Sequence, residues 1–340
     1  QDGVAITGVI APLKGKESKI RVAVMGELDA VVVPGHALCN KETGAAHCCG
    51  HNAQIASMVG VGYALAGTGI LEELSGDVVL MAVPSEEFVE IEYRNELRKA
   101  GKIHFLGGKQ EFIYLGVFDD IDMMIMQHTS TTENGDEAGK IKGNCGGSTG
   151  LGFMGKLVRY IGKEAHAGGA PHLGINALNA AQIGLAAVNA NRETFQDKDT
   201  IRVHPIITKG GGAVNAIPND VRMESYVRGA SLEAIKEANT KINRALAASA
   251  AAMGANVVLK DRPGYTPLEN EEQLYDLTCE IVKQCFGEDA LVKRGRSTGC
   301  TDMGDVSAVM PTVQPYASGA CGVGHGSDYR IADPESALVM

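Results

Sequence analysis

Residues 20–29 read IRVAVMGELD, and this stretch decides the fold. The apolar run over 20–25 is typical of a strand buried in a parallel sheet. Acidic residues follow it at once, and open α/β sheets bind their ligands beyond the carboxyl ends of such strands. Asp29 is therefore a candidate site residue; the alternative is that its carboxylate caps a turn or a helix.

Two further apolar runs end in polar side chains that suit a binding site. Residues 77–83, DVVLMAV, predict a second buried strand, and Glu86 and Glu87 follow it after a proline. Residues 123–126, MMIM, predict a third strand, which leads to His128. For the glutamates the alternative is a charged helix N-terminus, which the helix dipole favours. For His128 it is a hydrogen-bonded structural role.

A thiol and an imidazole lie close together in residues 47–54, HCCGHNAQ. In an extended or tightly turned backbone the side chains of Cys49 and His51 fall on the same side, and both are transition-metal ligands. A helix is predicted over 52–66, so the pair lies at a helix entrance. One alternative is a buried free thiol beside a polar turn. Another is a nucleophilic Cys48 or Cys49 with His51 as its base, which the short spacing makes geometrically poor.

A separate domain is predicted over residues 154–263. Its expected elements are strands over 156–162, 200–208, 220–228 and 255–260, and helices over 176–191 and 231–253. Their β-α-β-β-α-β order matches the split βαβ unit of ferredoxin-like domains. We therefore expect residues 1–153 and 264–340 to form one discontinuous α/β domain, into which the second domain is inserted.

The remaining segments belong to the first domain. Their expected elements are helices over 92–100, 109–118 and 271–286, a strand over 312–316, and polar or glycine-rich loops over 131–152, 296–306 and 318–324. The last loop ends at His325, which is another candidate ligand. A structural role is again the alternative for this histidine.

Composition and charge disfavour several classes of protein. The 340-residue chain has a formal net charge of −10 and 5% aromatic residues, which argues against binding to a phosphate backbone or stacking on nucleobases. We find neither a secretory signal nor an apolar stretch of membrane-spanning length. Eight cysteines without a C-x-x-C pair indicate reduced thiols and a cytoplasmic location. We expect both chain ends, Gln1 and the helix-like start at 337–340, to be trimmed.

Taken together, these motifs resemble those of a known family over nearly the whole chain and in the same order. The family is the di-metal amidohydrolases and carboxypeptidases, which include aminoacylases, hippurate hydrolases, auxin-conjugate hydrolases and aminobenzoyl-glutamate hydrolases. The matching stretches are GELDA (26–30), HCCGHNAQ (47–54), VPSEE (83–87), MQH (126–128), GKEAHAGGAPHLGINALNA (162–180), GGGAVNAIP (210–218) and GHGSDY (324–329), with Arg228. The sequence departs from the family pattern in several places. The helices that usually precede the first strand are lacking, and the closing helix is cut. Cys48 stands where a small residue is common, Glu27 stands where Asp is usual, and the segment between Glu87 and His128 is longer.

The resemblance implies a role for each candidate residue. The expected ligands of two divalent metal ions, zinc or else manganese, cobalt or nickel, are Cys49, His51, Glu87, His128 and His325. Asp29 would orient a ligand, Glu86 would be the general base, and His166 would stabilise the oxyanion, usually from the partner subunit of a homodimer. Asn215 and Arg228 would hold the carboxylate or carbonyl group of the substrate.

The resemblance also implies a fold and an activity. The fold is a mixed-sheet α/β metallohydrolase domain with an inserted ferredoxin-like βαββαβ lid or dimerisation domain. The activity is hydrolysis of the C–N bond of an N-acyl or N-aroyl amino acid or a short peptide, by metal-activated water with a glutamate base. Such small molecules are the expected partners, without nucleic acid or membrane. The alternative is a catalytically inactive metal-binding scaffold of the same fold, which the presence of both Glu86 and Glu87 disfavours.

Overall fold

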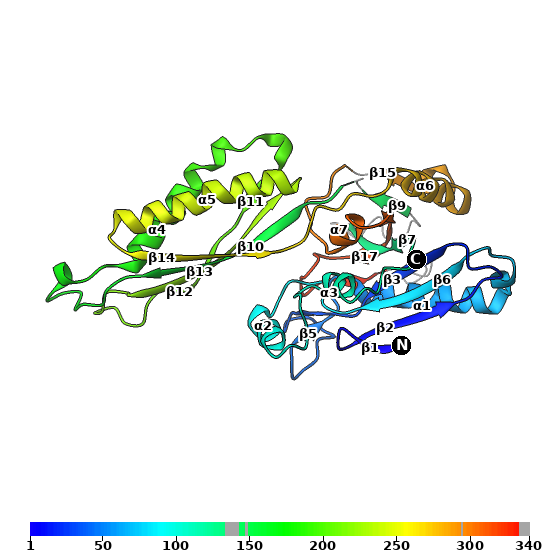
Figure 1. The fold of residues 1–340 in the computed structure, drawn as a ribbon, viewed down its shortest axis with the longest axis horizontal. Coiled ribbons are helices and arrows are strands. Elements are labelled where there is room, and N and C mark those ends of the chain that lie inside the picture. Colours follow the sequence, from blue (N-terminus) through cyan, green and yellow to red (C-terminus); the bar gives the residue numbers. More distant parts are fainter. Residues whose placement is uncertain (133–142, 147–148, 294, 333–340) are drawn as a thin grey trace. The chain divides into compact units, whose positions relative to one another are not determined.

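The structure, a computed structural model, describes residues 1–132, 143–146, 149–293 and 295–332. The chain forms two compact units (Figure 1). The discontinuous unit comprises residues 1–150, 268–297 and 301–340, and the inserted unit comprises residues 151–267 and 298–300. Within the described ranges, no helix is long and apolar enough to cross a membrane. The thiols of Cys39, Cys48, Cys49, Cys279, Cys285, Cys300 and Cys321 are free. The helix start expected at 337–340 lies outside these ranges.

A mixed sheet of six strands forms the centre of the discontinuous unit. Its strands are Asp2–Val4 (β1), Gly8–Leu13 (β2), Arg21–Glu27 (β3), Asp77–Val83 (β6), Met123–Met126 (β7) and Thr312–Val313 (β16). The order is β1-β2-β6-β3-β7-β16; β6, β3, β7 and β16 run parallel, and β1 and β2 form an antiparallel edge. The predictions of buried strands at β3, β6 and β7 are confirmed.

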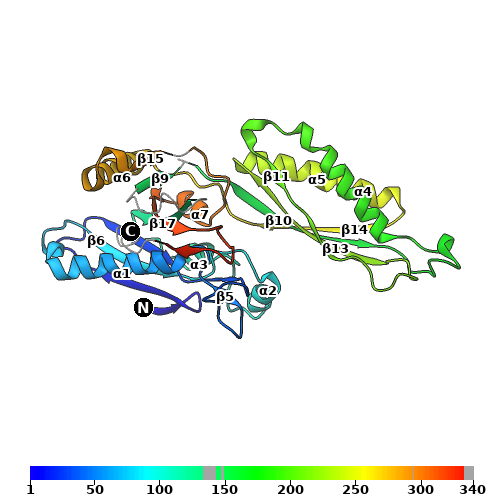
Figure 2. The same ribbon diagram turned by 180° about the vertical axis from the view of Figure 1, so that it is seen from behind.

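Helices cover both faces of this sheet. Met25 of β3 and Met81 of β6 are buried in one core with Phe112 of α3 (Gly108–Tyr114) and Met303 of α7 (Met303–Ser307). On the opposite face, α1 (His51–Thr68) lies against β3 so closely that a Cβ at Gly26 would touch it (Figure 2). A sheet covered on both faces leaves its strand ends as the natural place for a site.

Shorter elements complete the discontinuous unit. A second sheet has the order β15-β9-β17-β18, with β8 paired to β17, and β4 pairs with β5. The bounds are His128–Thr132 (β8), Gly143–Gly146 (β9), Leu291–Lys293 (β15), Tyr316–Cys321 (β17), Arg330–Ile331 (β18), Val31–Val32 (β4), Ala45–Ala46 (β5), Ile91–Lys99 (α2) and Glu272–Phe286 (α6). Since β8 starts two residues after β7 ends, His128 is the first residue of the second sheet.

The inserted unit has the order of strands and helices that was predicted for a ferredoxin-like domain. Its elements are Gly152–Ile161 (β10), Ala177–Ala190 (α4), Arg202–Val203 (β11), Ile206–Lys209 (β12), Asp220–Gly229 (β13), Leu232–Ala252 (α5) and Asn256–Pro263 (β14). The sheet order is β11-β13-β10-β14, with β12 also paired to β13, and every pairing is antiparallel. The helices α4 and α5 cover one face of this sheet (Figure 1). The predicted fold class, a mixed-sheet α/β domain with an inserted βαββαβ domain, is confirmed.

Two predictions of extended or irregular structure in the inserted unit and near it are wrong. The strand expected over 200–208 consists of β11 and β12, separated at Pro205, which has no N–H to donate to a sheet. The described part of the loop expected over 131–152 contains the last two residues of β8, the whole of β9 and the first residue of β10. The polar residues of β8 and β9 pair with β15 and β17. The composition of the segment itself gives no sign of these distant pairings.

Two predicted loops near the carboxyl end also contain regular structure. The loop expected over 296–306 includes α7, because Met303 and Val306 anchor one turn of helix in the core. Most of the loop expected over 318–324 is the end of β17, whose small residues Ala320 and Cys321 are buried and pair with β18. Small residues are typical of loops, so local composition carries no strand signal here.

Candidate active site

Three strand ends of the mixed sheet bring polar side chains to one edge. β3 pairs in parallel with β6 on one side and β7 on the other, and its last residue, Glu27, lies opposite Val83 of β6. Parallel strands end at the same edge of a sheet, so the residues that follow them become neighbours in space. These residues are Asp29, Glu86, Glu87 and His128.

The start of α1 brings a thiol to the same edge. The helix begins at His51 after Gly50, whose φ of 98° lies in the left-handed region. A Cβ at Gly50 would overlap the side chain of Thr129 in β8, so glycine permits the close approach of helix and strand. In this position Sγ of Cys49 lies 3.6 Å from Nε2 of His128.

Backbone carbonyl groups fix the orientation of two histidine rings. Nδ1 of His51 lies 2.9 Å from the carbonyl oxygen of Asp29, and Nδ1 of His128 lies 2.9 Å from that of Thr129. A hydrogen bond at one ring nitrogen directs the other towards a metal ligand position. The donor atoms of Cys49, His51 and His128 all lie within 4.8 Å of one another.

A second group of donors shares the thiol of Cys49. His325 follows β17 in a turn with φ of 62°, and its backbone N–H donates to the carbonyl of Cys48 at 2.8 Å. Its Nε2 lies 2.7 Å from Oε1 of Glu87. The donors of Cys49, Glu87 and His325 also lie within 4.8 Å of one another. The structure therefore brings together all five predicted metal ligands, while Cys48 is buried in a small apolar cluster.

The carboxylate of Asp29 connects the two groups. Its Oδ2 accepts a hydrogen bond from the backbone N–H of Glu87 at 2.8 Å. Its Oδ1 lies 3.3 Å from Nδ1 of His51. One side chain thus positions the turn after β6 and the imidazole at the start of α1, which is the geometry of a residue that orients ligands.

Glu86, the predicted general base, also lies beside the donor groups. It is buried, and its Oε2 lies 3.9 Å from Nε2 of His51. Burial, reinforced by the negative charges of Glu27 and Asp302, raises the pKa of Glu86 well above its ordinary value. A carboxyl group with a raised pKa is suited to taking up a proton and giving it away again.

Glu27, Lys109 and Asp302 form a buried group of charges behind the donors. Nζ of Lys109 lies 2.5 Å from Oε1 of Glu27 and 2.5 Å from Oδ1 of Asp302, and all three side chains are fully buried. Oε2 of Glu27 lies 3.0 Å from Nε2 of His51. Sequence reasoning assigned no role to any of the three, because a lysine at a helix start and an aspartate in a polar loop are usually solvated.

The thiol and the imidazoles of the site shift one another's pKa values. Burial by itself raises the pKa of the Cys49 thiol, but hydrogen bonds with His128, His325 and His51 lower it to about 6. Hydrogen bonds with Cys49 and Glu87 raise the pKa of His325 to about 10. The thiolate and the charged imidazole are therefore the stable forms at neutral pH in the metal-free chain.

The donor set fits divalent transition metals. Thiolate, imidazole and carboxylate are the ligands that zinc and its neighbours take in proteins. Among the buried side-chain atoms of the described residues that have no hydrogen-bond partner, four belong to this site: Glu27 Oε2, Asp29 Oδ1, His51 Nε2 and Glu87 Oε1. Each lies within 3.3 Å of another polar atom of the site. Buried polar atoms without partners are costly, and coordination to a metal would satisfy them.

The other three predicted site residues lie in the inserted unit. The backbone N–H of Ala167, next to His166, donates to the carbonyl of Asn215 at 2.8 Å, so these two predicted residues are neighbours. Arg228 lies on β13 with its guanidinium 5.9 Å from the ring centre of Tyr226. Within the described residues, Nε of Arg228 is buried without a hydrogen-bond partner, which suits a group that receives a ligand.

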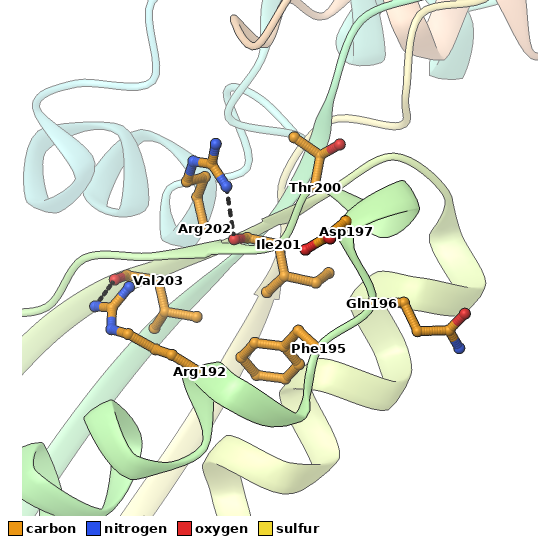
Figure 3. A pocket seen from close by; sticks show the side chains of 8 residues that line it. All are labelled: Arg192, Phe195, Gln196, Asp197, Thr200, Ile201, Arg202 and Val203. Atoms are coloured by element: carbon orange, nitrogen blue, oxygen red, sulfur yellow. Dashed lines mark hydrogen bonds between the residues drawn. The ribbon is translucent and has the colours of Figure 1, made fainter.

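A hollow of about 660 Å³ also lies in the inserted unit (Figure 3). It is bounded by β11 and by two short 3-10 turns, Arg192–Thr194 and Asp197–Asp199. The guanidinium of Arg192 is held by the carbonyl of Val203 at 2.7 Å rather than projecting freely. Its described lining includes none of the predicted site residues, so the donor chemistry, and not this hollow, marks the candidate active site.

Comparison with known proteins gives consistent results. Residues 23–339 match the model of peptidase family M20/M25/M40. The chain is 28% identical to the Xaa-Arg dipeptidase of Mus musculus over 87% of this chain and 61% of that protein. It is 29% identical to a p-aminobenzoyl-glutamate hydrolase homolog of Haemophilus influenzae over 69% of this chain and 52% of that protein. The chain thus spans about half to three fifths of the length of these relatives.

A solved structure shows the same fold. It is described as a dinuclear metal binding peptidase from Bacillus subtilis, and it is 21% identical to this chain. The TM-score is 0.71, over 98% of this chain and 82% of that one. The similarity therefore covers both the discontinuous and the inserted unit as folds.

The lowered pKa of Cys49 predicts its reactivity. In metal-free protein, the rate of Cys49 alkylation by iodoacetamide should rise with pH through a midpoint near 6, because only the thiolate reacts and the pKa is lowered to about 6. Mass spectrometry of the peptide that contains Cys49 measures this rate. A short unstructured peptide with one cysteine, whose thiol pKa is about 8.5, is the control. A midpoint at the reference value, or no protection of Cys49 by added Zn²⁺, would contradict the prediction.

Proposed function

The chain belongs to peptidase family M20/M25/M40, and from this we propose that it hydrolyses the amide bond of an N-acyl or N-aroyl amino acid or a short peptide, with divalent metal ions. Membership of the family confirms the resemblance found in the sequence. One observation carries the proposal: two groups of imidazole and carboxylate donors share the thiol of Cys49, and the carboxylate of Glu86 lies 3.9 Å from His51. A dipeptidase and an aminobenzoyl-glutamate hydrolase homolog among the relatives support this class of substrate.

The metals would be held by the two donor groups. Cys49, His51 and His128 form one group, and Cys49, Glu87 and His325 form the other. Ions bound there would polarise the scissile carbonyl and lower the pKa of a water molecule. Since a thiolate is a soft ligand, we propose zinc, or manganese, cobalt or nickel, rather than magnesium.

The side chains of the chain itself would carry out the proton transfers. Glu86 would accept a proton from the attacking water at a carboxylate oxygen and then donate it to the leaving nitrogen. Asp29 would hold the turn after β6 and the ring of His51 in place during the proton transfer. It contacts the backbone N–H of Glu87 at 2.8 Å and Nδ1 of His51 at 3.3 Å. His166 would donate a hydrogen bond to the oxyanion. Asn215 and Arg228 would hold the carbonyl or carboxylate of the substrate.

The two units would have different tasks. We propose that the discontinuous unit is the catalytic domain and that the inserted unit is a lid and dimerisation domain. His166 lies in the inserted unit, so its action on the catalytic domain of a partner subunit is the arrangement that a homodimer would provide. The free thiols among the described residues suit the reducing cytoplasm, which we retain as the proposed location.

Removal of metal tests the central proposal. A chelator should abolish hydrolysis of a panel of dipeptides, N-acyl amino acids and aminobenzoyl-glutamate, and addition of Zn²⁺, Mn²⁺, Co²⁺ or Ni²⁺ should restore it. Product release is measured by chromatography, and metal content by mass spectrometry. Hydrolysis that survives complete removal of metal would refute the mechanism. Stoichiometric metal binding without hydrolysis of any compound would support the inactive scaffold instead.

Substitution of the proposed base separates chemistry from metal binding. Glu86→Gln keeps the shape of the side chain but cannot accept the proton, so kcat should fall by about 10²–10⁴-fold with metal content unchanged. Glu96→Gln, a surface substitution in the pair with Lys99, is the matched control and should retain full activity. Normal turnover by Glu86→Gln would show that another group is the base.

Mixed dimers test the proposed role of His166. His166→Ala and Glu86→Gln should each be nearly inactive alone, but a refolded mixture should regain activity, because one site of each mixed dimer would contain both intact residues. Activity of the mixture is compared with that of each variant refolded by itself. Absence of recovery in a mixture that light scattering shows to be dimeric would exclude action across the interface.

A further inference from the structure

Lys109 is a buried lysine that the proposed mechanism does not use. Among the residues that the structure describes, the buried lysines are Lys109 and Lys156. Burial of an ammonium group is expensive unless carboxylates and hydrogen bonds compensate for the lost water. Lys156, in the inserted unit, is paired with Asp261 and hydrogen-bonded to Asn243 at 2.6 Å. Lys109 instead lies behind the candidate active site.

The side chain of Lys109 joins two carboxylates from distant parts of the chain. Its Nζ lies 2.5 Å from Oε1 of Glu27 at the end of β3, and 2.5 Å from Oδ1 of Asp302 before α7. Burial alone would lower the pKa of Lys109, but Asp302 and Glu27 raise it, so the ammonium stays charged. The same charge offsets the repulsion among these two carboxylates and Glu86.

Glu27 connects Lys109 to His51, one of the predicted metal ligands. One carboxylate oxygen of Glu27 is bound to Lys109, and the other, Oε2, lies 3.0 Å from Nε2 of His51. The backbone N–H of Glu27 donates to Oε1 of Gln54 at 3.0 Å, which fixes the same residue to α1. The ammonium of Lys109 and the imidazole of His51 thus contact different oxygens of the same carboxylate.

The backbone at Lys109 is fixed as firmly as its side chain. Its N–H donates to Oδ2 of Asp302 at 3.1 Å, so one carboxylate binds both ends of the residue. The preceding N–H, of Gly108, donates to the carbonyl of Ser85 at 3.1 Å. A Cβ at Gly108 would overlap the carbonyl of Pro84. The start of α3 is therefore in direct contact with the turn that carries Glu86 and Glu87.

We propose that Lys109 is a positioning residue of the metal centre. Its ammonium holds Glu27 against His51. Its contacts with Asp302 fix the start of α3, where the N–H of Gly108 binds the turn before Glu86. The kinetic part of this inference rests on the proposed function, whereas the effect on metal binding does not. Loss of the ammonium would leave Glu27 and Asp302 buried without their counter-ion. Both carboxylates would then move towards water or take up protons, and His51 would lose its fixed neighbour.

The test compares two buried lysines in the full chain. Lys109→Met should weaken Zn²⁺ binding by about 10–100-fold in calorimetric titration, as removal of partners behind metal ligands does. It should also change the visible absorption spectrum of the Co²⁺-loaded protein, which reports on thiolate coordination. kcat should fall by about 10²-fold with a smaller change in KM, because the reacting groups are misplaced. Lys156→Met is the matched control and should leave all three measurements unchanged.

Each outcome decides the proposal. Wild-type Zn²⁺ affinity and Co²⁺ spectrum in folded Lys109→Met would overturn it, and so would an equal loss in Lys156→Met. If Lys109→Met does not fold, Glu27→Gln decides, since it preserves shape and leaves the Lys109–Asp302 pair intact. Weaker Zn²⁺ binding by Glu27→Gln supports the proposal; unchanged binding, or failure of this variant to fold as well, overturns it. If wild-type protein binds Zn²⁺ but hydrolyses nothing, the proposed function fails while the metal measurements still decide the role of Lys109.

Discussion

The parallel pairing of β3 with β6 and β7 is the constraint on which the candidate site depends. These three strands are covered on both faces, so their side chains form a core and only their carboxyl ends are left for chemistry. The pairing sets Glu27 opposite Val83, which puts the turns after both strands side by side. A shift of one residue in this register would turn the core face of β3 outwards and separate Asp29 from Glu87. The fold and the site therefore share a single geometric requirement.

Charge balance is the second organising feature. Carboxylates and a thiolate meet in a region from which water is largely excluded, and Lys109 is a permanent counter-ion among them. The imidazoles supply the remaining positive charge in the metal-free chain, since the pKa values of His51, His128 and His325 are all raised. Imidazole must be neutral to bind a metal, so metal binding would release these protons. A site of this kind exchanges protons for metal ions, and its apparent metal affinity should increase with pH.

Much of the fold followed from local patterns, because apolar runs and turn residues report burial directly. The strands β3, β6 and β7, the helix α1 and the βαββαβ order of the inserted unit were all predicted. The errors arose where distant pairing overrides composition: the small residues of β17 form a strand only because β8, β9 and β18 lie beside them. The donors were found because each follows a strand or opens a helix. Lys109 was not, since its two partners lie 82 and 193 residues away in the sequence. The roles of the site residues stay predictions.

The position of His325 has a consequence for how the protein is made. Its backbone N–H binds the carbonyl of Cys48, and its ring meets Glu87, so the centre is closed by a residue that leaves the ribosome after the whole inserted unit. Synthesis proceeds from the amino terminus, and domains fold as they emerge. The nascent chain therefore carries the thiol of Cys49 during the synthesis of more than 270 further residues before the last donor arrives. A chain that stops short of residue 325 can keep every strand of the six-stranded sheet and still lack a complete centre.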